Sequence, residues 1–147
     1  MNKFVLGLLS FSLLNFSVIS AQEENSLQIQ RAQVVKEYLL SLEAGDIEHM
    51  NELLEDGAIV VSTSQGKVDA KTFFADFLPH IVSGQLEIHQ EFIGIETETD
   101  HYGVRFGLFL VMDDGWSGFG EYIDDFIFSP NSSKLLAVYM FENKHFE

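Results

Sequence analysis

The sequence has no cysteine and few cations, and each shortage excludes a class of function. Without cysteine the chain forms no disulfide, no zinc–thiolate site and no thiol nucleophile. Its 8 lysines and arginines stand against 23 aspartates and glutamates. Phosphate binding needs a basic surface, so we expect no nucleic-acid partner. The sequence also lacks a phosphate-binding glycine loop, a serine-triad motif and a metalloprotease helix.

The length and the apolar content predict one folded domain behind a removable leader. A chain of 147 residues with 14 phenylalanines can build a packed core. Residues 1–21 have the features of a secretory signal peptide: Lys3, an apolar run that ends at Ile19, and small residues at 20–21. The alternative is an uncleaved membrane anchor, although the run is short for a span. We therefore predict a secreted or periplasmic protein with a single domain over residues 22–147.

Hydrophobic periodicity predicts helices first and strands afterwards. Apolar residues at helical spacing indicate a helix over about residues 27–44, a short helix after Asp46 and a third helix after Asp69. A β-branched run at 58–63 precedes four longer strands, at about residues 85–97, 102–112, 116–128 and 134–143. This order predicts an α+β fold, in which three N-terminal helices cover one face of a curved antiparallel sheet.

The Asp-Gly step at 114–115 predicts a two-residue hairpin turn between the second and third of these long strands. The register that we favour places Arg105 opposite Asp124 and sets large residues against glycines. A slip of one residue would place Phe109 opposite Phe119 and move Arg105 away from Asp124.

Three segments of the chain resemble the nuclear transport factor 2-like superfamily, in particular its SnoaL-like and ketosteroid-isomerase-like members. They are VVKEYLLSLEAGDIEHMNELLEDGAIV, KTFFADFLPHI and GEYIDDFIFSPNSSKLLAVYMF, and the resemblance covers about residues 27–143. One turn departs from the family pattern, because Ser132-Ser133-Lys134-Leu135 stands where the family often has Gly-Lys-Ile. The resemblance implies a cone-shaped fold with a deep apolar pocket and frequent dimers through the sheet. Its members include isomerases, cyclases, dehydratases, hydrolases and non-catalytic modules, so the fold does not decide the function.

Asp124 and Arg105 are the candidate catalytic residues. In the family-like position Asp124 would point into the pocket, where desolvation raises a carboxyl pKa and suits it to acid–base work. Arg105 stands in an apolar strand and could hold a ligand carboxylate or oxyanion. The alternative for both is a structural ion pair between them, which would lower the Asp124 pKa.

Aromatic residues supply the candidate ligand-binding wall. Tyrosines combine an apolar ring with a hydroxyl donor, and plain core packing is their alternative role. Trp116, close to the hairpin turn, is a candidate for closing the pocket mouth or for covering the sheet. The ligand-binding candidates are Tyr38, Phe77, Phe92, Trp116, Tyr122 and Tyr139.

The opposite sheet face is a candidate homodimer interface, and a partly solvated outer surface is the alternative. In the favoured register this face carries an apolar centre within an acidic rim. The expected apolar residues are Ile93, Phe106, Leu108, Phe119 and Ile123. His89 and Glu91 share the face, but two strand residues make a weak metal site, and we predict no metal and no cofactor.

The sequence thus leads to a secreted SnoaL-like protein that binds a small apolar molecule. If it is an enzyme, cofactor-free acid–base chemistry at Asp124 is expected. The alternative is a non-catalytic dimerising module.

Overall fold

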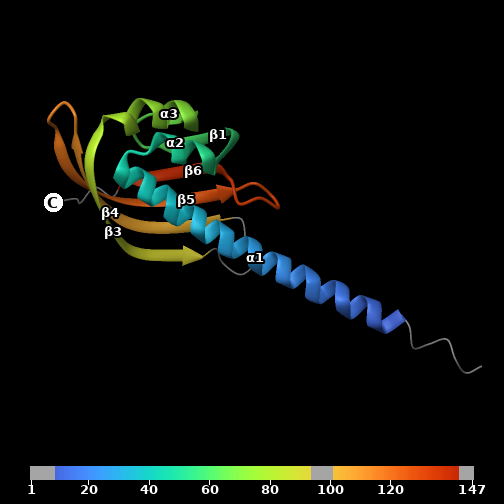
Figure 1. The fold of residues 1–147 in the computed structure, drawn as a ribbon. Helices are drawn as coiled ribbons and strands as arrows, with labels where there is room; N and C mark the ends of the chain where they lie inside the picture. Colours follow the sequence, from blue (N-terminus) through green and yellow to red (C-terminus); the bar gives the residue numbers. More distant parts are fainter. Residues whose placement is uncertain (1–8, 94–100, 143–147) are drawn as a thin grey trace, which may run out of the picture.

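The computed structural model describes the backbone of residues 9–93 and 101–142, with side chains described at residues 26–91 and 101–142. The elements follow in the order predicted, helices first and long strands last (Figure 1). They are α1 (Leu9–Ala44), α2 (Ile47–Leu53), β1 (Leu54–Ser62), β2 (Gly66–Asp69), α3 (Ala70–Phe77), the 3-10 turn η1 (Leu78–His80), β3 (Ile81–Ile93), β4 (His101–Met112), β5 (Ser117–Phe128) and β6 (Leu135–Glu142).

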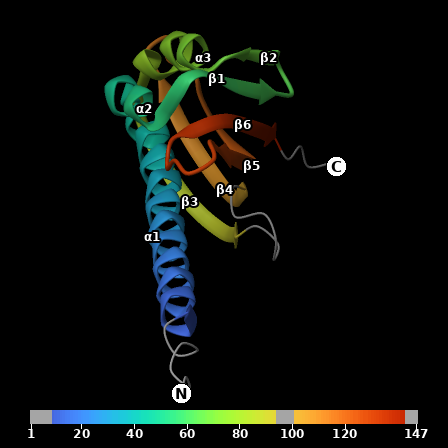
Figure 2. The same cartoon turned by 90° about the vertical axis from the view of Figure 1, so that its right-hand side faces the viewer.

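Six strands form one curved sheet in the order β2-β1-β6-β5-β4-β3. The helices gather on its concave side (Figures 1 and 2). The N-terminal part of α1 extends away from the body, and its C-terminal part runs along the sheet. The core lies between the two layers, with Tyr38 from α1, Phe74 from α3 and Phe126 from β5 fully buried. The α+β cone fold predicted from the sequence is confirmed.

Two features of the sheet differ from the expectation. β1 pairs in parallel with β6, although every other pair is antiparallel, so the sheet is mixed. The segment after the first strand, where no strand was predicted from the sequence, forms the short strand β2 against β1. Neither feature leaves a mark in hydrophobic periodicity, which reports the faces of a strand and not the direction of its neighbour.

α1 begins at Leu9, well before the start predicted at residue 27, and continues without a break past Ala21. No helix within the described residues is long and apolar enough to cross a membrane. The signal-peptide prediction for residues 1–21 remains a prediction.

The hairpin register favoured from the sequence is wrong, and the slipped alternative is the one that forms. Val104 lies opposite Asp124, Arg105 opposite Ile123 and Phe109 opposite Phe119. The reason lies in the turn: Val111 pairs with Ser117, so the connection is longer than the two residues assumed. Side chains alternate between faces along a strand, so this slip moves Arg105 and Phe109 to the convex face.

The same slip brings Phe106 and Leu108, expected on the convex face, into the concave core. Both side chains are buried there. Of the predicted apolar centre, Phe119 and Ile123 are the members with described side chains that remain on the convex face. Phe109, which was expected on the concave face, joins them there.

Local signals position the helices as the sequence indicates. The Asp46 carboxylate accepts a hydrogen bond from His49 N at 3.0 Å and caps α2, and the Asp69 carboxylate accepts one from Thr72 N at 2.9 Å and caps α3. Gly45 follows α1 with a φ of +67°, in the left-handed region that glycine adopts at helix ends. These caps set where α2 and α3 begin and where α1 ends.

Candidate functional site

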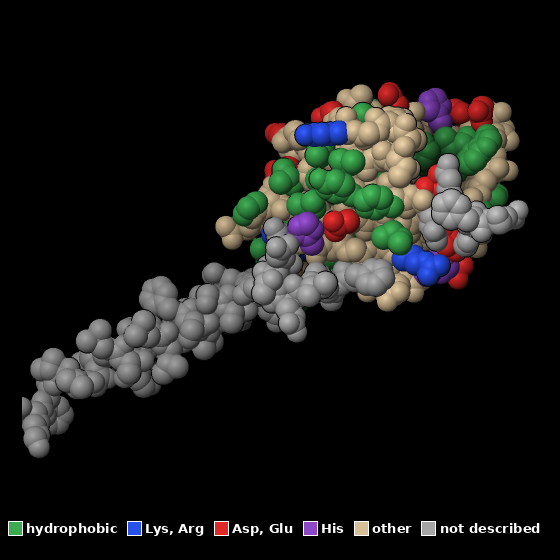
Figure 3. Space-filling model, turned by 180° about the vertical axis from the view of Figure 1, so that it is seen from behind, with side chains coloured by type: hydrophobic (Ala, Val, Ile, Leu, Met, Phe, Trp, Pro, Cys, Tyr) green, Lys and Arg blue, Asp and Glu red, His purple; other side chains and the backbone are tan. Residues whose placement is uncertain are grey.

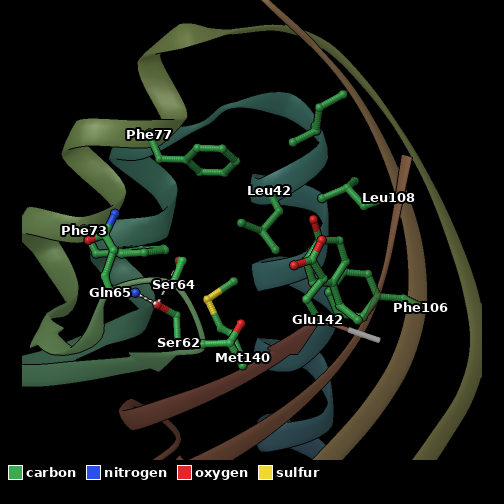
Figure 4. A pocket seen from close by; sticks show the side chains of 13 residues that line it. Leu42, Ser62, Ser64, Gln65, Phe73, Phe77, Phe106, Leu108, Met140 and Glu142 are labelled. Carbon is green, nitrogen blue, oxygen red and sulfur yellow. Dashed lines mark hydrogen bonds between the residues drawn. The ribbon is translucent and has the colours of Figure 1, made fainter. Parts of the chain in front are cut away.

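A pocket of about 270 Å³ opens between α3, the β1–β2 hairpin and the concave face of β4–β6. Phe73 and Phe77 from α3 stand on one side, and Phe106 and Leu108 from β4 stand on the other (Figure 4). Binding pockets for small molecules start at about 300 Å³, so this space suits a compact ligand. Its lining consists of Leu42, Ser62, Thr63, Ser64, Gln65, Phe73, Phe77, Phe106, Leu108, Leu110, Tyr122, Met140 and Glu142.

The lining of the pocket includes polar groups beside its apolar walls. Ser62 Oγ accepts a hydrogen bond from Gln65 N at 3.1 Å and lies 3.4 Å from Ser64 Oγ, which holds the β1–β2 hairpin in shape. Glu142, at the end of β6, supplies the single charge among the described lining residues. The pocket thus combines apolar walls with hydroxyl groups and one carboxylate.

Tyr122 carries a hydroxyl into this pocket from β5. Its ring stacks on Phe106 with centroids 5.6 Å apart and an interplanar angle of 26°. A Cβ on Gly120 would meet the Tyr122 hydroxyl oxygen at 2.5 Å, so the glycine leaves room for the hydroxyl to lie along the strand. Burial, and then the carboxylates of Glu142 and Asp124, raise the pKa of Tyr122 above its ordinary value. The hydroxyl therefore remains a hydrogen-bond donor.

Asp124 lies beneath the pocket rather than in its wall. It is completely buried, and it is absent from the lining residues, whereas its neighbour across the strands, Met140, and Tyr122 two positions earlier both line the pocket. Tyr38 donates a long hydrogen bond of 3.5 Å to Asp124 Oδ2. Within the described part of the chain Asp124 Oδ1 has no hydrogen-bond partner.

Burial determines the protonation of Asp124. Desolvation raises the pKa of its carboxyl well above the ordinary value, and the hydrogen bond from Tyr38 offsets a part of that shift. Asp124 therefore keeps its proton to a higher pH than an exposed carboxyl does. Burial, and then the charge of Asp124 and their hydrogen bond, also raise the pKa of Tyr38.

Arg105 is not part of this arrangement, and the Arg105–Asp124 ion pair considered from the sequence does not form. The Arg105 guanidinium lies on the convex face, where Nη2 contacts Glu121 Oε2 at 3.1 Å. The slipped register separates the two residues, because Asp124 pairs with Val104 and points to the other face of the sheet.

The structure brings some of the predicted binding residues to the pocket and not others. Phe77 and Tyr122 line it, whereas Tyr38 is buried behind it, with its ring packed edge-on against Phe126 at 4.8 Å. Trp116 is 57% exposed and lies over Gly118 near the hairpin turn, away from the lining. The side chain of Phe92 lies outside the described ones, so its predicted role in binding stays a prediction.

Tyr139 lies on the convex face. Its neighbours along β6, Val138 and Met140, face the core and the pocket, so the residue between them points the other way. A predicted role of Tyr139 in the wall of the concave pocket therefore has no geometric support.

Several lining residues were not anticipated. Ser62 and Thr63 were expected only as the end of the strand at 58–63, and Glu142 only as part of the strand at about 134–143. The parallel pairing of β1 with β6 places the β1–β2 hairpin beside the pocket-facing residues of β6, and no local pattern in the sequence shows this pairing. The described residues contain no group of three or more metal-binding side chains, and His89 lies near Glu87 on the convex face.

No protein-family model and no curated protein matches the chain. Solved structures do share its fold. A pinacolase from Penicillium brevicompactum has a TM-score of 0.65 and 12% identity, over 81% of this chain and 86% of that one. An LEH-like epoxide hydrolase from M. tuberculosis has a TM-score of 0.62 and 11% identity, over 78% and 84%.

A SnoaL-like protein from a Jannaschia species, named as a candidate polyketide cyclase, has a TM-score of 0.61 and 14% identity, over 78% of this chain and 86% of that one. At such identities the likeness establishes the fold and nothing of the chemistry. The chain has the nuclear transport factor 2-like cone fold, as the sequence resemblance implied.

Proposed function

We propose that this protein binds a small, largely apolar molecule in the pocket between α3 and the sheet. The observation that carries the proposal is the pocket itself: about 270 Å³ of space on the concave face of the sheet, beside the core. Aromatic and aliphatic walls contribute the affinity, since burying apolar surface stabilises a complex by about 25 cal/mol per Å² before the costs of binding. The hydroxyl of Tyr122 and the hairpin serines orient the ligand.

Two methionines make the test specific. The Met140 side chain lines the pocket, whereas Met50 is fully buried and does not line it. With ¹³C-labelled methionine methyl groups, a small neutral apolar probe such as cyclohexanone should shift the Met140 resonance in a saturable manner and leave Met50 in place. Saturation without a shift at Met140 would mean that the probe binds elsewhere and would contradict the proposal.

A matched pair of hairpin variants provides the control. Ser64 and Lys67 are both exposed on the β1–β2 hairpin, but only Ser64 lines the pocket. Ser64→Trp should weaken the probe by about tenfold because the indole obstructs the opening, a loss of about 1.4 kcal/mol. Lys67→Trp should leave the affinity unchanged. Equal affinities in the two variants would place the probe outside this pocket.

Acid–base catalysis at the same site is the second candidate function. The buried Asp124 carboxyl with an unpartnered Oδ1 favours it, because a carboxyl with a raised pKa is suited to moving protons near neutral pH. Its complete burial beneath Tyr122 and Met140 favours binding alone. Deuterium incorporation from D₂O at the carbon beside the carbonyl of bound cyclohexanone separates the two. An enzyme should exchange faster than its Asp124→Asn variant, and a binding protein should show no difference.

A homodimer through the convex sheet face is the arrangement that we propose for the protein in solution. Hydrophobic side chains gather in the middle of the face seen from behind, with acidic and histidine side chains nearby (Figure 3). Phe109, Phe119, Ile123 and Phe141 are exposed at 38–61%. Exposed rings in one region mark interfaces more often than scattered single residues do.

Sedimentation tests the dimer directly. Phe119→Asp should give a monomer, because it places a charge in the apolar centre. Val82→Asp is the control: it changes an apolar residue on β3 that is 65% exposed, and it should leave the dimer intact. A wild-type protein that sediments as a monomer would rule the dimer out.

For localisation we propose that residues 1–21 direct export and are removed. The support is the composition of that segment, with Lys3 ahead of an apolar run. Intact-mass measurement of the exported protein should give an N-terminus at Gln22. A protein that keeps Met1 or its neighbours would favour an anchor.

A further inference from the structure

Two aromatic side chains lie along the concave side of β5, each over a glycine. A Cβ on Gly120 would lie 2.5 Å from the Tyr122 hydroxyl oxygen, and a Cβ on Gly118 would lie 2.5 Å from the nearest atom of the Trp116 ring. Each glycine thus leaves the space in which one ring rests. The two glycines share a face of the sheet and lie about 7 Å apart along the strand. Tyr122 and Trp116 therefore form one aromatic strip.

This strip continues the wall of the pocket toward the β4–β5 turn. Tyr122 and Leu110 both line the pocket. Leu110 pairs with Gly118, so the Trp116 ring covers the strand position across from a lining residue, although Trp116 is itself outside the lining. Trp116 is 57% exposed. A molecule seated in the pocket can therefore extend along β5 and meet an indole that is open to solvent.

The backbone of the turn holds Trp116 in this place. The Trp116 N–H donates to Asp114 Oδ1 at 2.8 Å, and the Trp116 carbonyl oxygen accepts from Met112 N at 2.8 Å. A ring on a fixed backbone gives up little conformational freedom when a ligand packs on it, and less lost freedom means higher affinity. The position of Trp116 is thus prepared for binding before a ligand arrives.

We propose that the ligand extends out of the pocket along β5 and packs an aromatic ring on Trp116. This inference rests on the proposed function and specifies its ligand class: a compact apolar part inside the pocket, joined to an aromatic ring outside it. The pocket alone, about 270 Å³, lies below the usual range for drug-sized ligands, so a two-part ligand uses the strip as well. Contact between two aromatic rings contributes about three- to tenfold in affinity.

Three ketones separate the inner part from the outer ring. Cyclohexanone has the inner part alone, 4-phenylcyclohexanone adds an aromatic ring, and 4-cyclohexylcyclohexanone adds a saturated ring of similar size. Titrations followed at the Met140 methyl group compare their affinities in the wild type and in Trp116→Leu, which keeps an apolar side chain but removes the ring. The variant should bind the phenyl ketone about three- to tenfold more weakly. Cyclohexanone should be unaffected, and the cyclohexyl ketone should lose less than the phenyl ketone.

Fluorescence gives a second and independent measurement, because Trp116 is the one tryptophan in the chain. The phenyl ketone should move the emission maximum to shorter wavelength as it displaces water from the indole, with the dissociation constant measured at Met140. Cyclohexanone should leave the maximum in place. Phe119→Leu is the matched control, since Phe119 is also on β5 and 61% exposed but faces the convex side. It should keep the wild-type affinity for all three ketones.

The outcomes distinguish this inference from the proposed function. The extension is overturned, and the proposed function stands, if cyclohexanone saturates Met140 but the phenyl ketone does not bind, binds Trp116→Leu as tightly as the wild type, or leaves the emission maximum unchanged. Equal losses for the phenyl and cyclohexyl ketones in Trp116→Leu would overturn the aromatic ligand class. If no ketone shifts the Met140 resonance, the proposed function fails and the inference fails with it.

Discussion

The Tyr38 hydroxyl oxygen lies 3.5 Å from Oδ2 of Asp124, and neither side chain is exposed to solvent. The contact joins α1 to β5 through the centre of the core. A buried carboxyl is costly when charged and much less so when protonated. The protonation of Asp124 is therefore coupled to the stability of the whole fold, which can be measured without knowledge of the ligand.

Stability should decrease as the pH rises above the ordinary carboxyl pKa. Burial raises the folded-state pKa of Asp124, so the folded protein keeps a proton that the unfolded chain releases above about pH 3.9. The unfolded state then binds fewer protons, and the free energy of unfolding falls by up to about 1.4 kcal/mol per pH unit until the folded pKa is reached. Asp124→Asn does not titrate and should lose this slope in urea unfolding.

The control for this pH series is Asp76→Asn, which changes an exposed aspartate on α3. It should keep the wild-type slope. A slope that persists in Asp124→Asn would mean that another buried group titrates and that Asp124 is ionised in the fold.

Tyr38→Phe should raise the pKa of Asp124 further. The Tyr38 hydroxyl donates to the carboxyl and lowers its pKa, so removing the hydroxyl removes that offset. The stability loss should be about 0.5–1.5 kcal/mol, the range for one hydrogen bond. ¹³C NMR titration of the carboxyl measures the shift, and Tyr102→Phe, another buried tyrosine, should leave the pKa of Asp124 unchanged.

The architecture followed from the sequence because its signals are local. Asp46 and Asp69 cap helices through contacts three residues away, and periodicity identifies the buried face of each element. Tyr122, Asp124 and Phe126 share the inward face of β5, as alternation along one strand predicts, whereas the inward direction of that face was implied by the family resemblance.

The pairing between elements could not be read in the same way. The register of β4 against β5 depends on the length of their turn, and a difference of one residue moves Arg105 from the side of Asp124 to Glu121 on the convex face. The pocket depends on long-range pairing as well, because β1 and β6 meet in parallel from opposite ends of the domain. Glu142 gains its place in the pocket only through that pairing.

Gly84→Ala should destabilise the fold by about 1–3 kcal/mol, the cost of overpacking a core. A Cβ at this position would overlap the carbonyl oxygen of Glu43 at the end of α1, and a backbone atom cannot turn aside as a side chain can. The same contact region includes the hydrogen bond from Leu86 N to Glu43 Oε1 at 2.9 Å. The midpoint of urea unfolding should fall with an unchanged m-value.

Gly118→Ala is the matched control, because the three atoms nearest to a Cβ there all belong to the ring of the exposed Trp116, which can move. Its midpoint should change little. Equal losses in the two variants would mean that strand propensity, and not the approach of α1 to β3, requires glycine at position 84.

Arg31 holds the turn between β5 and β6 and should be the most sensitive cation in the fold. It is 3% exposed, and its guanidinium donates to the Ser132 and Ser129 carbonyl oxygens, both at 2.9 Å, while it lies 5.2 Å from the centroid of the Phe128 ring. Arg31→Met should cost about 1.5–3 kcal/mol, because it leaves carbonyl groups without a charged donor. Lys cannot span both oxygens, so Arg31→Lys should recover only a part.

Urea unfolding measures the global loss for Arg31, and hydrogen exchange locates it. The Ser129 amide donates to the Lys134 carbonyl oxygen at 3.3 Å across the turn, so its exchange should accelerate more than that of the core strand amides. Lys36→Met, which changes an exposed cation one and a half turns further along α1, should alter neither measurement. If Arg31→Met behaved like Lys36→Met, the β5–β6 turn would be stable without the guanidinium, and Arg31 would be buried for a reason other than holding that turn.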